Sequence, residues 1–358
     1  TLVAARAREM SARTGGDILL QLLASFWARL AGRGPDRVLD GPTSDVWIDP
    51  WVAHLRRLGV ELRFGTTVRS IELSGRAIRA VWSDASGTLS EHAPDWVVSA
   101  LPVEQLIPLV TPAMTEVDPR LGRLDRLVTR WMNGVMFYLR RPVPVCHGHV
   151  IHIDSPWSLT SISQAQFWAH TPLDGFGDGT VADVLSVDVS DWDTPGLISG
   201  KPAMACSRDE IVADVWLQLC EHLNGGDEVL LEDADLLGAF VDEDIVGGGP
   251  HPEVNLEPLL FNTAGSWADR PTARTAFDNL FLAGDFVRTY TDLATMEGAN
   301  EAARRAVNAL LDAAGSPAPR ARVFPLHEPA IFAPFRAIDR ARWRLRHRPL
   351  TVGPGEGT

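Results

Sequence analysis

Residues 279–306 constrain the fold of this chain more than any other stretch. The apolar run 280–283 leads directly into Gly284-Asp285, and after a loop a helical pattern begins near Thr295. In an open α/β sheet, ligands bind where strands end and helices begin, because free backbone N–H groups and the helix dipole point there. Gly284 would let another group approach the backbone closely, and Asp285 would accept a hydrogen bond from a hydroxyl. The alternative interpretation is that Asp285 is only a turn or capping residue.

Two further patterns predict a sheet around this unit. From Gly59 onward, apolar residues alternate with polar ones through Val68 and Val81, and turn residues stand at 74–75 and 86–87, which predicts two or three strands. The run 96–101 is uniformly apolar and ends at Pro102, as expected for a strand buried on both faces of a parallel sheet.

Helical spacing of apolar residues predicts the remaining regular structure. Helices are expected over 1–31, over 43–57 with Trp47 and Trp51 on one face, over 207–223 and over 295–313. The region between about 124 and 260 is rich in Trp and Pro and predicts short strands packed around a cavity, at 134–139, 150–153 and 184–189. The expected inner side of the last helix consists of Met296, Ala299, Ala303, Ala306, Val307 and Leu310.

The segment NLFLAGDFVRTYTDLATMEGANEAARRA resembles the C-terminal FAD motif of the flavin amine oxidase and carotenoid desaturase superfamily. The resemblance implies FAD as the cofactor, with Asp285 at the ribityl and pyrophosphate groups and with Met296 and Glu297 facing the flavin. A positive helix end at that place would stabilise negative charge on the reduced flavin ring. The FAD-binding residues implied in this segment are Gly284, Asp285, Thr295, Met296, Glu297 and Ala299.

A second stretch, 59–81 together with 95–102, is similar to the central FAD-domain strands of the same superfamily. The similarity implies that Val68 lies against the adenine and that Ala100 and Pro102 lie near the dinucleotide. Alternation alone predicts no more for Val68 than a core position in a strand.

The implied fold class is α/β with α+β character, a Rossmann-like FAD domain of the glutathione-reductase type interleaved with a substrate domain of mixed sheet and helices. A length of 358 residues suits two such domains. The expected divisions are a helical part of the substrate domain at 1–58, FAD-domain strands at 59–115, the substrate domain at 116–264, the C-terminal FAD segment at 265–315 and a basic tail at 316–358.

The glycine-rich GxGxxG loop that opens such FAD domains does not occur in the sequence. We therefore expect the FAD domain to be incomplete at its N-terminus, with the pyrophosphate-binding half of the site supplied by residues outside this chain. The expected explanation is that the sequence is a fragment. The alternative is a protein that has lost the loop.

Three functions fit these observations, although no catalytic residue is identified. Segment 279–306 and the segment SPWSLTSISQAQFW (155–168) look nearest to bacterial phytoene-desaturase-like and hydroxysqualene-dehydroxylase-like flavoproteins, which implies desaturation or dehydroxylation of an apolar isoprenoid. Twelve Trp and two Tyr suit an apolar tunnel, although a large core gives the same count. A flavin amine oxidase is the second reading, weakened because Lys201 is the single lysine. The third is a non-catalytic truncated relative that binds lipid or a partner.

Composition limits the partners and the compartment. A net charge of −13 argues against nucleic acid, which needs a basic face. Residues 320–348 differ, with eight Arg against Glu328 and Asp339, which predicts a peripheral contact with anionic lipid or a partner; the alternative is a solvated helix. Three cysteines without a CxxC pair predict a reducing, cytoplasmic compartment, with contact at the inner face of the membrane as an extension.

Other chemistries lack a sequence anchor. GxSxG, HExxH and Walker A patterns are absent, which disfavours hydrolase, zinc protease and P-loop readings. His147 and His149 would share a strand face near His152, but with no third ligand in phase we predict no metal site. The oligomeric state is not predicted.

Overall fold

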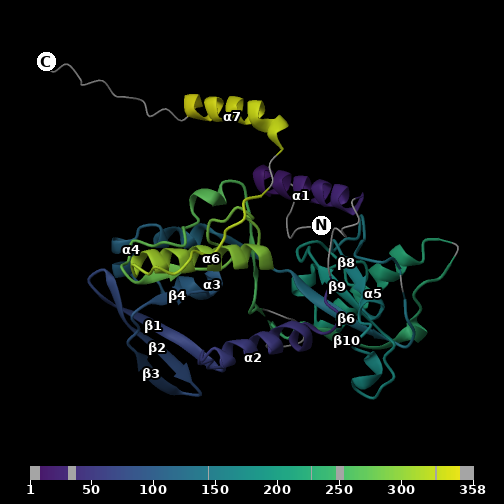
Figure 1. The fold of residues 1–358 in the computed structure, drawn as a ribbon. Coiled ribbons are helices and arrows are strands. Elements are labelled where there is room, and N and C mark those ends of the chain that lie inside the picture. Colours follow the sequence, from purple (N-terminus) through teal and green to yellow (C-terminus); the bar gives the residue numbers. More distant parts are fainter. Residues whose placement is uncertain are drawn as a thin grey trace.

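The chain forms two lobes, each around its own hydrophobic core, with two helices lying above them (Figure 1). The computed structural model describes residues 9–30, 38–143, 145–226, 228–246, 254–326 and 329–346. Parts of the predicted N-terminal helical segment (1–8 and 31–37), and Glu328 and Arg348 of the basic tail, lie outside these described residues.

The first lobe contains a three-stranded antiparallel meander and a pair of parallel strands. The meander is β1 (Thr66–Ser74), β2 (Ala77–Ala85) and β3 (Thr88–His92), with left-handed glycines, Gly75 and Gly87, in its two turns. The parallel pair is β4 (Val97–Ser99) and β14 (Leu280–Leu282). The helices of this lobe are α3 (Val103–Leu106), α4 (Pro112–Val117) and α6 (Met296–Ala313).

Asn279 joins the meander to the parallel pair. Its side-chain oxygen accepts a hydrogen bond from Ile78 N at 2.7 Å, and its amide donates to Ile78 O at 3.0 Å. Its own carbonyl accepts from Val97 N at 2.8 Å. The side chain and the backbone of this one residue therefore fix the start of β14 against both sheets.

The second lobe is a five-stranded antiparallel sheet with the order β10-β6-β9-β8-β7. Its strands are β6 (Asn133–Leu139), β7 (Val150–Ile151), β8 (Thr160–Ser163), β9 (Asp183–Val189) and β10 (Leu236–Val241). Alternate residues such as Val135, Phe137 and Val187 pack into one core with α5 (Arg208–Leu223). Ser207 and Glu210 form a capping box at the start of α5.

Smaller elements complete the chain. Two short antiparallel pairs are β5 (Val128–Arg130) with β13 (Leu259–Phe261), and β11 (Ile245–Val246) with β12 (Val254–Asn255). A π-helical turn (Ser44–Ile48) precedes α2 (Asp49–Arg57). Helices α1 (Ala12–Leu30) and α7 (Ala333–Arg346) lie above the lobes (Figure 1). Within the described part of the chain, no helix has both the length and the apolar character needed to cross a bilayer.

The mixed α/β fold class predicted from the sequence is confirmed, but the predicted alternating strand between Gly59 and Phe64 is wrong. The structure begins β1 only at Thr66, and Phe64 is 69% exposed. Alternation creates a strand only where a neighbouring strand can pair with it, and residues 60–64 carry no ladder in the structure. The domain boundaries proposed from the sequence remain predictions.

The predicted inner side of the last helix is also wrong in part. Ala306 is buried and Leu310 half-buried as expected, but Met296 is 60% exposed, and Ala299, Ala303 and Val307 are exposed. The buried side of α6 instead carries Gly298, Glu301, Ala302 and Ala306. A buried carboxylate on this side shifted the true face by about one position relative to the apolar pattern.

Candidate functional site

The carboxyl ends of β4 and β14 lie side by side and form the centre of the candidate site. The ladder continues past the strands, with Ala283 N donating to Ser99 O at 2.8 Å. Gly284 follows with φ +114°, and a Cβ there would lie 3.1 Å from Phe286 Cε1 and 3.4 Å from Leu101 O. Glycine is therefore required for this turn to adopt its backbone conformation against the segment that follows β4. The turn at Gly284 lies against Leu101, and Asp285 follows it directly.

Two buried polar atoms at this strand edge have no hydrogen-bond partner among the described residues. They are Ser99 Oγ and Glu104 Oε1. Burial raises the pKa of Glu104, and the nearby charge of Asp285 raises it further. Burial also raises the pKa of Asp285, against the opposing effect of the Arg270 charge. Native structures rarely leave buried polar atoms unpaired, so this edge is suited to a ligand that offers several hydroxyl donors.

Helix α6 begins beside this edge. Thr295 is its N-cap, and its hydroxyl accepts from Gly298 N at 3.1 Å. A Cβ on Gly298 would lie only 2.4 Å from Leu293 O, so the helix starts in close contact with the loop before it. Met296 and Glu297 occupy the exposed first turn, whose N–H groups have no partner within the helix. This end of the helix is therefore positive and open to an anionic or carbonyl group.

Arg270 and Asp292 hold the loop between β14 and α6. Arg270 is 1% exposed and forms an ion pair with Asp292, which has a left-handed φ of +48°. The guanidinium also donates to Asn262 Oδ1 at 2.7 Å and to the carbonyl of Asp285 at 3.0 Å. Thr14 of α1 donates to the other oxygen of Asp292 at 2.7 Å. The network ties α1 and the second half of the chain to the loop that carries Asp285.

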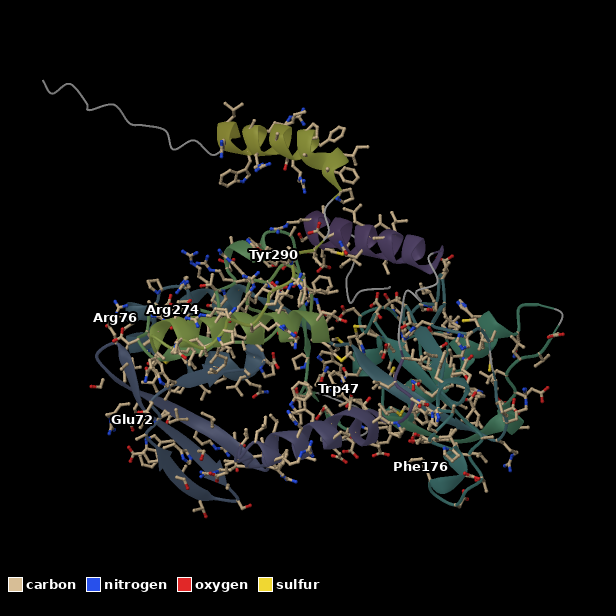
Figure 2. The ribbon with its side chains drawn as sticks, in the orientation of Figure 1. Trp47, Glu72, Arg76, Phe176, Arg274 and Tyr290 are labelled. Carbon is tan, nitrogen blue, oxygen red and sulfur yellow. The ribbon has the colours of Figure 1, made fainter. Side chains whose placement is uncertain are left out.

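Glu301 holds the same loop from the other side. Its carboxylate accepts from the backbone N–H groups of Tyr290 at 2.7 Å and Thr291 at 3.1 Å. Arg305, one turn further along α6, forms an ion pair with it and lies over the Tyr290 ring at 4.6 Å. Figure 2 shows Tyr290 on the upper side of the first lobe. A buried carboxylate that accepts three hydrogen bonds from the loop, two from N–H groups and one from the Thr291 hydroxyl, fixes the loop relative to α6.

The structure thus brings together most of the residues predicted for the site. Gly284 lies against Leu101, the residue between Ala100 and Pro102, with Asp285 next in the chain, and Thr295, Met296, Glu297 and Ala299 form the start of the adjoining α6. Val68 is half-buried in β1 and packs against the first core, so its adenine contact stays a prediction. The sequence did not point to Ser99, Glu104, Arg270 or Glu301. Ser99 and Glu104 could have been found from the sequence, because they lie next to the predicted residues Ala100 and Pro102. Arg270 and Glu301 could not, because their contacts are with residues distant in sequence.

A large cavity lies against the second lobe. Its volume is about 920 Å³, and it covers the face of the five-stranded sheet opposite α5. The alternation of β6 places Val135 and Phe137 in the core and Met136 and Tyr138 in the cavity. Figure 2 shows Phe176, one of the lining residues, at the lower end of this lobe and Trp47 where the lobes meet. The apolar lining residues are Val38, Leu39, Met136, Ile162, Trp168, Leu173, Phe176, Val181 and Val184.

The three clustered histidines occupy different environments. His149 lines the cavity, His147 contacts the Phe167 ring, and His152 is buried. His152 stacks on His222 with ring centroids 5.7 Å apart, and burial lowers its pKa to about 4. In the described ranges, no group of three or more His, Cys, Asp or Glu side chains could hold a metal ion.

Parallel strand ends, a close-approach glycine, the half-buried carboxylate of Asp285 and a helix N-terminus are features typical of nucleotide-cofactor sites. The family model described as "Flavin containing amine oxidoreductase" matches residues 20–311, and the chain belongs to this family. A comparison with curated proteins found no match. The protein is therefore an FAD-dependent oxidoreductase.

The polar groups at the strand edge are chemically suited to bind FAD. The carboxylate of Asp285 and the unpaired Ser99 Oγ and Glu104 Oε1 offer the hydrogen-bonding groups that a polyhydroxylated ribityl chain needs. The first turn of α6 would stabilise negative charge at the flavin. The individual contacts of these residues with FAD remain predictions, as does the supply of the pyrophosphate half of the site from outside this chain.

Proposed function

We propose that this FAD-dependent oxidoreductase desaturates or dehydroxylates an apolar isoprenoid-type substrate. When bound, FAD supplies a hydride acceptor, its N5 atom. The chain's own contribution is then to bind the substrate, to orient it and to exclude water. A catalytic acid or base is not part of the proposal.

The observation that carries the proposal is the cavity of the second lobe. About 920 Å³ lies at the large end of the range for ligand sites. Its lining is mainly aliphatic and aromatic, and Asp45 is the one carboxylate among the described residues that line it. Such a wall favours a long hydrocarbon, because each buried CH₂ contributes about 0.8 kcal/mol, and it offers few partners to a polar substrate.

Amine oxidation is the competing function within the family. Tyr138, Trp168 and Phe176 supply aromatic faces in the cavity that could hold a cation. Lys201 does not support it, because its ammonium forms a 2.6 Å ion pair with Glu210 at the start of α5. Lys201 is also not among the residues that line the cavity.

Anaerobic reduction of the flavin tests the choice. The FAD-loaded, full-length protein is mixed with squalene- or phytoene-like lipids or with amines, and loss of the yellow flavin absorbance is followed. Reduction by the lipids and not by amines is expected. Reduction by amines alone would replace the proposal with amine oxidation, and a full-length protein that retains no flavin would leave the non-catalytic relative as the remaining reading.

A matched pair of substitutions links the reduction to the cavity. Met136 on β6 and Phe240 on β10 are cross-strand partners on the same sheet face, but only Met136 lines the cavity. Met136→Trp should slow reduction by lipid about tenfold by filling the cavity, with Phe240→Trp close to the parent. Equal rates for both variants would show that the substrate binds elsewhere. In parallel, Asp285→Ala should lower the fraction of bound FAD, and unchanged retention would remove Asp285 from the site.

A further inference from the structure

Helix α7 and the segment before it expose an unusual amount of apolar surface. Figure 1 shows α7 above α1, outside both lobes. None of its large apolar side chains belongs to either hydrophobic core. The side chains with more than half of their surface exposed are Ile331, Phe335, Ile338, Trp343 and Leu345. Contiguous exposed apolar surface of this kind marks an interaction site.

One side of α7 is apolar, although Phe335 and Trp343 lie outside it. Pro334, Ile338, Ala341 and Leu345 recur at intervals of three or four residues and form one stripe. Arg336, Arg340 and Arg344 recur every four residues on the opposite side, and Arg342 lies at the border of the apolar stripe. The helix is therefore amphipathic, with long Arg side chains that can extend along an apolar boundary while their charges stay in a polar layer.

The charge of α7 is opposite to that of the chain. Five Arg and one Asp give the helix a net charge of +4, whereas the whole chain carries −13. A partner for α7 must therefore be anionic as well as apolar. A bilayer that contains anionic lipids offers both properties in the geometry of an amphipathic helix, with the headgroups beside the Arg side and the acyl chains beneath the apolar side.

Helix length decides how such a contact would lie. With 14 residues and a rise of about 1.5 Å per residue, α7 is about 21 Å long. A spanning helix needs about 20 mainly apolar residues. A helix of this length and polarity lies in the plane of the interface.

Helix α1 extends the same surface. Its Leu19 and Leu23, one turn apart, each have more than half of their surface exposed. Arg13 of α1 lines a common hollow with Phe332, Phe335 and Arg336 of the C-terminal segment, so the two helices are neighbours. Leu19 and Leu23 thus add exposed apolar area on the helix that neighbours α7.

We propose that α7 and the exposed side of α1 form a docking surface for an anionic lipid bilayer. The proposal does not rest on the identity of the substrate, because it follows from the two helices alone.

Co-sedimentation with vesicles tests the proposal. The full-length, FAD-loaded protein is mixed with vesicles of phosphatidylcholine alone or of phosphatidylcholine with phosphatidylglycerol, at low and high salt. Sedimentation with the anionic vesicles only, weakened by salt, is expected. Absence of sedimentation with anionic vesicles would overturn the proposal.

Paired variants assign the contact to the two helices. Ile338→Ser with Leu345→Ser should lower vesicle affinity at least tenfold, and Leu19→Ser with Leu23→Ser should lower it by a smaller factor. Arg340→Gln with Arg344→Gln should lower it about tenfold or more, since each Arg near an anionic surface contributes about fivefold. The controls are Ile153→Ser with Leu256→Ser, exposed on the second lobe, and Arg57→Gln with Arg123→Gln, exposed on α2 and after α4.

The controls should bind vesicles like the parent, and all variants should keep the parent's FAD content and thermal midpoint. Equal loss in target and control variants would show a nonspecific effect and overturn the assignment to α7 and α1. Vesicle binding that is insensitive to the target variants would also overturn it. Capture of an acidic protein through the same arginines, without vesicle binding, would identify a protein interface instead of a lipid surface.

Discussion

The Arg270–Asp292 ion pair allows a quantitative test of how the loop after β14 is held. Arg270→Met keeps much of the side-chain volume but removes the guanidinium that bonds Asp292, Asn262 and the carbonyl of Asp285. It leaves the carboxylate of Asp292 buried without its charged partner. Breaking a buried pair on one side costs about 3–5 kcal/mol, and we expect a loss of stability in this range.

A double-mutant cycle separates the pair from its surroundings. Asp292→Asn removes the partner charge and tolerates the left-handed backbone, because Asn adopts positive φ more readily than most residues. The double variant Arg270→Met with Asp292→Asn leaves neither charge unpaired. Its loss should be smaller than the sum of the two single losses by about 2–3 kcal/mol, within the range known for residues in direct contact.

Urea unfolding followed by circular dichroism provides the measurement, with Asp312→Asn as the control. Asp312 forms a 2.8 Å ion pair with Arg320, but the two side chains are 69% and 39% exposed, so its loss should be at most about 1 kcal/mol. A loss for Arg270→Met no larger than that of the control, or additive losses in the cycle, would refute the view that this pair holds the loop.

Two further predictions concern the helix start and the pH dependence of stability. Gly298→Ala would place a Cβ 2.4 Å from Leu293 O, so it should destabilise the protein by about 1–3 kcal/mol and weaken FAD binding. The control Ala303→Ser, on the exposed side of α6, should be nearly neutral. Equal FAD affinities of the two variants in titrations would contradict a tightly packed helix start. The pKa of His152 is about 4 in the folded protein and 6.5 for the free side chain. The unfolded state therefore binds the proton at higher pH, and the free energy of unfolding falls by up to about 3 kcal/mol as pH drops from about 6.5 to 4. His152→Gln should reduce this acid slope in urea unfolding and His54→Gln, exposed on α2, should not; an unchanged slope for His152→Gln would show that His152 is not the group responsible.

Local patterns predicted the elements of the site well. The run 280–283, the turn at Gly284 and the helix after Thr295 are where the sequence places them, because strand burial, glycine conformation and capping are properties of neighbouring residues. The turns of the meander and the capped helix α5 were predictable for the same reason.

Contacts between distant residues were not predictable from one sequence. Glu301 is buried because it accepts hydrogen bonds from Tyr290 and Thr291, and this contact rotates the buried side of α6 away from the apolar pattern. Arginine is usually a surface residue, yet Arg270 is buried and donates hydrogen bonds to Asn262, Asp285 and Asp292. Residues 60–64 show the converse, an alternating pattern that forms no ladder in the structure.

The pairing of β4 with β14 also determines when the cofactor edge can form during protein synthesis. Ser99 and Leu282 are register partners, so 183 residues of chain separate the two halves of the strand edge. At about 5–20 residues per second, the ribosome delivers β14 on the order of 10–40 s after β4. During that interval the apolar strand β4 has no β14 to pair with, and a nascent chain in this state is open to chaperones and to aggregation. The cofactor edge is thus completed late in synthesis, after the whole second lobe has left the ribosome.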